Sequence, residues 1–114
     1  MAMKIIKDSI SKNELRKIAE NQFGDLVKAV VDIEKKIMAV GGDLHADEEE
    51  LLLREESRQE NLWGVNLHID NPAEEFIEFD SMINVRPSQN NRSRNVESLD
   101  TQRKIRDIIS KLIL

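Results

Sequence analysis

The clearest hydrophobic pattern in the chain lies at its C-terminal end. Apolar residues recur there at intervals of three and one, the spacing that gathers side chains on one face of an α-helix. This stripe consists of Ile105, Ile108, Ile109, Leu112 and Ile113. The basic residues Arg103, Lys104 and Arg106 fall outside it, and Asp100 stands where a helix N-cap is expected. The pattern therefore predicts an amphipathic helix that begins near Asp100.

A second helix is predicted near the N-terminus, after a short β-prone segment at residues 4–7. Ser11 and Glu14 have the spacing of a capping box, in which each side chain bonds to the backbone amide of the other residue. Gly24 is placed to end the helix in a left-handed conformation. Apolar residues follow the box at helical spacing: Leu15, Ile18 and Ala19.

Further segments have the composition of β-strands. Residues 26–33 are rich in valine and are followed, after a polar turn, by residues 37–40, so the two are expected to pair as a hairpin. Residues 62–69 alternate in part, and the turn after them leads to a second expected strand at 75–80. Residues 82–85 are expected to continue that strand after a bend.

Residues 46–54 are predicted to form a short helix, because the acidic residues 47–50 stand at the end where the helix dipole favours negative charge. The run Leu51–Leu53 is also compatible with a strand, which leaves this segment open. The element order is therefore β-α-β-β-(α)-β-β-α. It predicts an α+β fold in which two or three helices cover one face of a mainly antiparallel sheet of four to five strands. The length favours a single domain over residues 1–114.

The composition is that of a folded chain with an aliphatic core. Of the 114 residues, 39% are apolar, 34% are charged and only 4% are aromatic. The absence of cysteine excludes disulfides, a thiol nucleophile and thiolate metal sites. No apolar run approaches the roughly 20 residues of a membrane span, and residues 1–8 are too short and too polar for a signal peptide. We therefore expect a cytoplasmic protein without membrane contact.

The net charge of −5 is distributed unevenly. Residues 43–60, the acidic lobe, carry eight acidic and two basic side chains, whereas residues 86–106, the basic lobe, carry six basic and two acidic ones. The two lobes are expected to face each other, within the fold or across a dimer. An isoelectric point of about 5.1 and the scarcity of aromatic residues argue against nucleic acid as a partner.

The most polar stretch of the basic lobe is residues 86–95, called here the polar loop. It contains three arginines, three asparagines and two serines. Guanidinium groups bind phosphate and carboxylate groups bidentately, and amides and hydroxyls add neutral donors. Long loops without structure of their own are uncommon in small domains and are often functional. The candidate ligand-binding residues are Arg86, Asn90, Asn91, Arg92, Ser93 and Arg94.

A second candidate site lies in residues 41–48. In an extended chain, Asp43, His45 and Asp47 would share one face and offer an O-N-O set for acid–base chemistry or a divalent metal. In a helix they would point in different directions, with an aspartate as the cap and the histidine at the surface. Because the usual spacing of metal ligands is missing, we predict no metal site. These three residues and Asp80 are the candidate catalytic residues.

Two further residues carry weaker signals. Trp63 is the sole tryptophan and is expected in the core or at an interface, with stacking on a ring-shaped ligand as the alternative. His68 is expected on the polar face of its strand, near Glu78 and Asp80 of the hairpin partner. This arrangement predicts a histidine–carboxylate pair.

The stretches VVDIEKKIMAVGGDLHADEE, RQENLWGVNL and FIEFDSMINVRPSQNNRSR resemble those of a known family. It is a family of short prokaryotic proteins catalogued only as a domain of unknown function, and the likeness extends from Ile5 to the final helix. The resemblance implies a stand-alone cytoplasmic domain. It transfers no activity, cofactor or catalytic residue.

Three functions remain open from the sequence. The first is a module that binds an anionic ligand, such as a phosphate, a nucleotide or an acidic peptide, through the polar loop. The second is a small hydrolase or lyase in which a histidine and a carboxylate act on an anion held by the arginines. The third is a structural homo-oligomer in which the lobes pair between subunits. The sequence identifies no cofactor.

Overall fold

The computed structural model describes residues 3–114 and has the element order that the sequence predicts. The α+β fold is thereby confirmed, and the segment left open between helix and strand is a helix. The strands are β1 (Lys4–Ile6), β2 (Leu26–Asp32), β3 (Ile37–Val40), β4 (Leu62–His68) and β5 (Ile77–Glu78). The helices are α1 (Lys12–Asn21), α2 (His45–Arg54) and α3 (Leu99–Leu112).

The strands form one five-stranded antiparallel sheet in the order β1-β3-β2-β4-β5. β2 and β4 pair over their full length, from Leu26 opposite His68 to Asp32 opposite Leu62. Successive side chains of a strand point to opposite faces of a sheet. The odd-numbered residues of β2 and β4 therefore face one side, and the even-numbered residues face the other.

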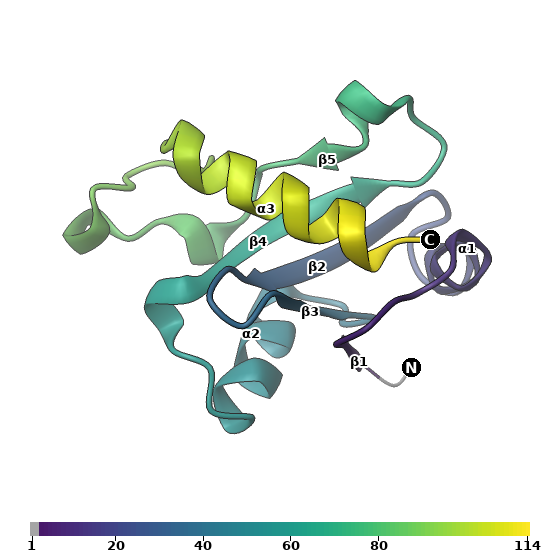
Figure 1. Cartoon of the computed structure of the whole chain (residues 1–114), viewed down its shortest axis with the longest axis horizontal. Helices are drawn as coiled ribbons and strands as arrows, with labels where there is room; N and C mark the ends of the chain where they lie inside the picture. Colours follow the sequence, from purple (N-terminus) through teal and green to yellow (C-terminus); the bar gives the residue numbers. More distant parts are fainter. Residues whose placement is uncertain (1–2) are drawn as a thin grey trace.

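The helices α1 and α3 cover the face of the odd-numbered residues (Figure 1). Ser11 caps α1 as predicted, since its hydroxyl accepts a hydrogen bond from the Glu14 amide. The C-terminal stripe packs against the sheet, with Ile105 fully buried, and Trp63 lies in the same core at 6% exposure. The sheet contributes Val27, Ala29, Val31, Met38, Val40, Val65 and Leu67 to this larger core.

The prediction that all helices lie on one face of the sheet is wrong, because α2 covers the opposite face. α2 lies behind the sheet in Figure 1, and its Leu52 is fully buried in a smaller core with Val30, Ala39 and Leu62. The physical reason is visible in β2. Its adjacent residues Val30 and Val31 are both fully buried, as expected of a strand that is covered on both faces.

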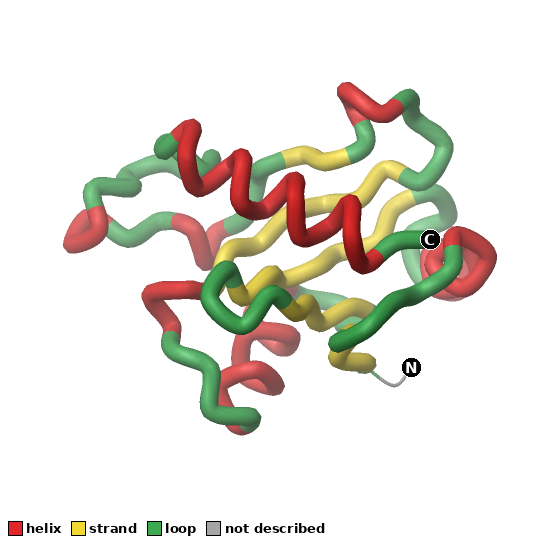
Figure 2. The backbone as a smooth tube through the Cα atoms, viewed as in Figure 1, coloured by secondary structure: helices red, strands yellow, loops and turns green. Residues whose placement is uncertain are grey.

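The chain between β4 and α3 is less regular than predicted (Figure 2). The strand expected at 75–80 is reduced to β5, because residues 73–75 form a 3₁₀ turn. Its expected continuation is a second 3₁₀ turn, Met82–Asn84, in which the Ser81 hydroxyl accepts from the Ile83 amide. α3 begins at Leu99, and its N-cap is Ser98 in place of Asp100, because the Ser98 hydroxyl accepts from the amide at position 101.

Gly64 allows two segments to pack closely against β4. A Cβ atom at this position would lie 2.6 Å from both Cβ and Oγ of Ser81. It would also lie 3.2 Å from Cδ2 of His45. The glycine is therefore required by the close approach of α2 and of the turn after β5.

We expect Gly64→Ala to lower the free energy of unfolding by about 1–3 kcal/mol, because the added methyl overpacks a closed contact. Urea denaturation would measure the change. Adding Ser81→Gly removes both clashing atoms, so the double variant should be more stable than the sum of the single effects predicts. Additive effects would contradict this explanation. Gly24→Ala is the control, since a Cβ there meets no atom within 4 Å and only the φ of +96° is unfavourable.

Candidate functional site

The outer edge of β4 explains why residues 84 and 86 are polar. β5 pairs only with Asn66 and Leu67 of β4, so the earlier backbone groups of β4 need other partners. Asn84 supplies them for Gly64. Its side-chain oxygen accepts from the Gly64 N–H at 2.9 Å, and its amide group donates to the Gly64 carbonyl at 3.0 Å. An amide side chain thus stands in for a neighbouring strand.

Arg86 supplies hydrogen bonds for the backbone at the start of β4. Its guanidinium donates to the Leu62 carbonyl at 2.7 Å and to the Gln59 carbonyl. It also lies 4.1 Å from the centre of the Trp63 ring, a cation–π contact. Partial burial lowers the pKa of Arg86 below its usual value. The first arginine of the polar loop is therefore engaged by protein groups.

Asn91 orders the polar loop from inside. It is 3% exposed, and its amide group donates to the carbonyls of Asn84 and Asn95, each at 2.7 Å, and of Ser93 at 3.1 Å. Its oxygen accepts from the Glu97 N–H at 2.8 Å. One buried side chain therefore ties together both ends of the loop.

Glu97 is held by the loop as an anion. Its Oε2 atom accepts three hydrogen bonds: from the backbone N–H of Arg92 at 2.9 Å, and from the backbone N–H and the hydroxyl of Ser93 at 2.8 Å each. The Ser93 hydroxyl and the two backbone groups lower the pKa of Glu97, although the side chain is exposed. Consecutive N–H groups aimed at one oxygen are a recurrent anion-binding arrangement. We call the donors of Arg92 and Ser93 the anion nest.

The remaining loop residues lie at the surface. Arg94 donates through Nε to Asp80 at 2.6 Å, and both side chains are partly exposed. Asp80, a candidate catalytic residue, is therefore ion-paired. Arg92 is exposed and has no ion-pair partner within residues 3–114. Asn90 adopts the left-handed conformation with a φ of 60°, which asparagine tolerates well.

The two charged lobes touch through main-chain groups. Arg86 donates to the Gln59 carbonyl, and Gln89 donates to the Glu60 carbonyl at 3.1 Å. In the described part of the chain, no ion pair joins the acidic lobe to the basic lobe. The expected contact between the lobes is present, but it does not neutralise their charges.

A hollow of about 530 Å³ lies between the polar loop and the start of α3. Its lining includes Trp63, Asn90, Glu97 and Thr101. The Trp63 Nε1–H group is a buried donor with no hydrogen-bond partner among residues 3–114. The hollow therefore adjoins the loop and the residue Glu97 that occupies the anion nest.

The second candidate site is not assembled as an O-N-O set. α2 begins at His45, so the three residues point in different directions. Asp43 and Asp47 are exposed and line a small hollow of their own, whereas His45 is buried. The expectation of an aspartate cap and a surface histidine is also wrong, because the N-cap is Leu44 and makes no side-chain capping bond.

His45 is turned toward the sheet because it shares the buried side of α2. Its Nε2 donates to the Val65 carbonyl at 2.8 Å, which places the proton on Nε2 and leaves Nδ1 as the basic nitrogen. Burial lowers the pKa of His45, so the ring is neutral at pH 7. Within the described residues no carboxylate is hydrogen-bonded to it. His45 can accept a proton or a hydrogen bond, but it has no acidic partner in contact.

Glu48 is a buried acid that the sequence analysis missed. Its side chain is fully buried beneath α2. Oε2 accepts from the Gly42 N–H at 2.9 Å, and Oε1 has no partner among residues 3–114. Burial raises the pKa of Glu48 to about 9, so the carboxyl is protonated at neutral pH. The available signal was its position four residues before Leu52, on the same face of the helix.

The histidine–carboxylate pair predicted on the second hairpin is present. His68 Nε2 and Glu78 Oε1 are 3.0 Å apart. Asn66 donates to the same oxygen at 3.0 Å, and these bonds, that of His68 first, lower the pKa of Glu78. The Asn66 oxygen is itself buried without a partner in the described part of the chain. β4 and β5 therefore carry a polar row on the face that α2 covers in part.

Within residues 3–114, no group of three or more His, Asp or Glu side chains is placed to hold a metal ion. The same residues contain no helix that is long and apolar enough to cross a membrane.

We expect Glu48→Gln to change how stability depends on pH. The native carboxyl keeps its proton up to about pH 9, whereas the unfolded chain loses it near pH ~4.3. Between these values the native state binds more protons than the unfolded state, so the free energy of unfolding falls as pH rises. Glutamine has no such loss. From acidic pH to pH 7, the free energy of unfolding of wild type should therefore fall by on the order of 3 kcal/mol relative to that of the variant.

Urea denaturation across this pH window would measure the difference. His45 is retained in both proteins, so its own loss of stability below its usual pKa cancels in the comparison. Glu20→Gln, at an exposed position of α1, is the matched control and should follow wild type. Parallel curves for Glu48→Gln and wild type would contradict the buried, protonated state of Glu48.

The chain matches a known protein family over most of its length. A family model described as "Protein of unknown function (DUF5674)" matches residues 4–112. No curated protein and no solved structure shows significant similarity. The matched range runs from the first residue of β1 to the last residue of α3, and it includes both the polar loop and α2.

Proposed function

We propose that the chain, which belongs to the DUF5674 family of proteins of unknown function, is a binding module for a small anion. The ligand is a phosphate or a phosphate ester, and the anion nest holds it. The observation that carries the proposal is the set of three hydrogen bonds that Arg92 and Ser93 donate to one oxygen of Glu97. Glu97 is then an internal occupant of the nest that the ligand displaces.

The charges around the nest favour this exchange. Arg92 and Arg94 flank Ser93 in the sequence. A phosphate carries more negative charge than a carboxylate and accepts bidentate hydrogen bonds from guanidinium groups. The guanidinium of Arg92 has no ion-pair partner within residues 3–114. A phosphate therefore competes with Glu97 for the same donors and gains an additional one.

The other candidate residues support the nest from behind. Asn91 fixes the turn through carbonyls on both sides of the nest. Arg86 anchors the start of the loop to β4. Asn90 and Glu97 line the hollow of about 530 Å³ beside the nest, which offers room for the organic part of a phosphate ester.

Titration with inorganic phosphate tests the proposal. The amide resonances of Arg92 and Ser93 report on the nest, and the indole N–H of Trp63 reports on the hollow. Glu97→Gln removes the competing charge but keeps an acceptor oxygen, so phosphate should bind about two- to tenfold more tightly. Ser93→Ala removes the hydroxyl donor and should weaken binding by a similar factor, which corresponds to one hydrogen bond.

Two variants control for general effects. Ser88→Ala changes an exposed serine of the same loop, and Glu74→Gln removes an exposed charge elsewhere. Both should bind phosphate as wild type does. If Glu97→Gln gains no affinity and the Arg92 and Ser93 resonances stay in place, the nest is only a structural turn and the proposal is wrong.

A small hydrolase or lyase is the second candidate. The contact of 3.0 Å between His68 and Glu78 and the neutral ring of His45 favour it. It ranks below the binding module because Asp43 and Asp47 face away from His45, so the predicted residues do not meet in one place.

A homo-oligomer is the third candidate, and the charges that the two lobes leave unpaired favour it. Pairing of lobes between subunits predicts dissociation as ionic strength rises. Gel filtration over a salt series would measure this, and an elution volume independent of salt would contradict it.

A further inference from the structure

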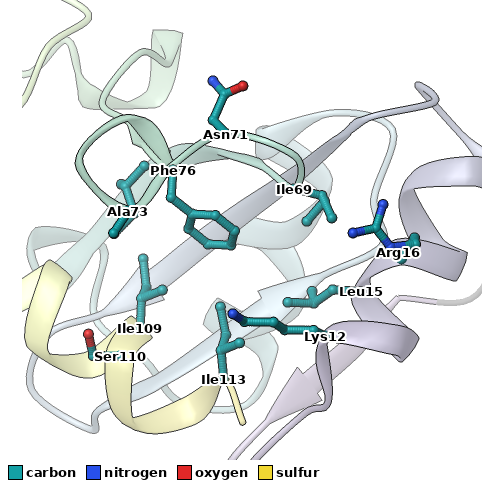
Figure 3. Close-up of a pocket in the computed structure, with 11 residues that line it drawn as sticks. Lys12, Leu15, Arg16, Ile69, Asn71, Ala73, Phe76, Ile109, Ser110 and Ile113 are labelled. Atoms are coloured by element: carbon teal, nitrogen blue, oxygen red, sulfur yellow. The ribbon is translucent and has the colours of Figure 1, made fainter.

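A groove on the side of the larger core belongs to none of the sites described above (Figure 3). Its volume is about 340 Å³, at the lower end of the ~300–1,000 Å³ range of small-molecule sites. Its walls are the start of α1, the end of α3 and the connection between β4 and β5. The larger apolar side chains that form them are Leu15, Ile69, Phe76, Ile77, Ile109 and Ile113.

Backbone hydrogen bonds hold these walls in place. The Ile10 N–H donates to the Leu112 carbonyl at 2.7 Å, and the Leu114 N–H donates to the Ile10 carbonyl at 3.0 Å. These bonds tie the end of α3 to the segment before α1. On the opposite wall, the His68 N–H donates to the Phe76 carbonyl at 2.8 Å. The groove is therefore preformed.

The charge of the groove is positive, in a chain whose net charge is −5. Its charged lining residues are Lys12 and Arg16. Arg16 donates to Asp70 at 2.6 Å, whereas Lys12 has no ion-pair partner within residues 3–114. In Figure 3 the side chain of Lys12 extends toward Ile113. Apolar walls with one available cation complement an amphipathic anion.

We propose that this groove binds a small molecule with an apolar body and one terminal carboxylate, such as a medium-chain fatty acid. The body packs against Leu15, Phe76 and Ile109, and the carboxylate pairs with Lys12. Removal of the hydrocarbon from water supplies most of the affinity, and the ammonium group selects the carboxylate. The site is separate from the anion nest, because the two lie at opposite ends of α3.

NMR titration of the full chain with octanoate, 1-octanol and acetate tests the proposal. Octanoate should shift resonances of the groove residues and leave those of Arg92 and Ser93 in place. It should bind about two- to fivefold more tightly than 1-octanol, the contribution of one exposed ion pair. Acetate, which lacks the apolar body, should cause no shift at the same concentration.

Variants separate the two halves of the site. Lys12→Met should abolish the preference for octanoate over 1-octanol, whereas Lys17→Met, an exposed lysine of α1 outside the groove, should keep it. Ala73→Trp places a large ring at an exposed lining position and should block both ligands. Ala46→Trp, at an exposed position of α2, should block neither. Circular dichroism confirms that each variant is folded.

Three results would overturn the proposal. One is an octanoate response scattered over the surface, and another is an unchanged preference for octanoate in Lys12→Met. The third is a change of the groove resonances with protein concentration and not with octanoate, which would identify a second copy of the chain as the occupant. None of these affects the phosphate titration at the nest, so the two proposals fail separately.

Discussion

The outer edge of β4 constrains the segment between β5 and α3, because its backbone groups need hydrogen-bond partners there. β4 directs backbone groups of Leu62, Gly64 and His68 to this edge, and β5 is too short to pair with all of them. A buried backbone group without a partner costs about 1–3 kcal/mol. Asn84 and Arg86 therefore complete the edge with side-chain donors and acceptors. The polar side chains of Asn84 and Arg86 thus serve the backbone of a strand that is distant in sequence.

Structure that follows from local sequence signals could be predicted, whereas contacts between residues distant in sequence could not. The Ser11 cap of α1 and the apolar stripe of α3 follow from local signals, and both are confirmed. The return bond of the capping box is not formed among residues 3–114, where the Glu14 carboxylate accepts from Lys4. The partners of Asn84 and Arg86 lie 20 and 24 residues away in sequence, and no local pattern encodes such contacts. The pairing of His68 with Glu78 was predictable because the two residues belong to adjacent strands of one hairpin.

The N-cap of α3 and the buried side of α2 could not be derived from the sequence, because tertiary geometry decides both. Ser98 and Asp100 are both favourable N-cap residues, and only the geometry at the Thr101 amide decides between them. The acidic run at 47–50 has the composition of an exposed face. Burial of Glu48 within it follows from the side of α2 that Leu52 fixes against the sheet.

Two glycines make the burial of polar side chains beneath α2 possible. A Cβ atom at Gly42 would lie 2.7 Å from Cγ of Glu48, and one at Gly64 would lie 3.2 Å from Cδ2 of His45. Each buried side chain also bonds a backbone group of the sheet region, Glu48 that of Gly42 and His45 that of Val65. Both are held in their neutral forms because desolvation disfavours charge. The smaller core thus combines apolar packing at one end of α2 with neutral polar contacts at the other.

The two ends of α3 also differ in polarity, and the two proposed binding sites rest on this difference. At the N-terminal end, Ser98 and Glu97 use their oxygens to satisfy backbone N–H groups, so the surroundings are rich in donors for oxygen acceptors. At the C-terminal end, the stripe outlasts the helix, since Ile113 continues it in extended conformation and pairs with Ile10. Apolar side chains there meet those of α1 without filling the space between the helices. One amphipathic helix therefore has polar surroundings at its first turn and apolar surroundings at its last.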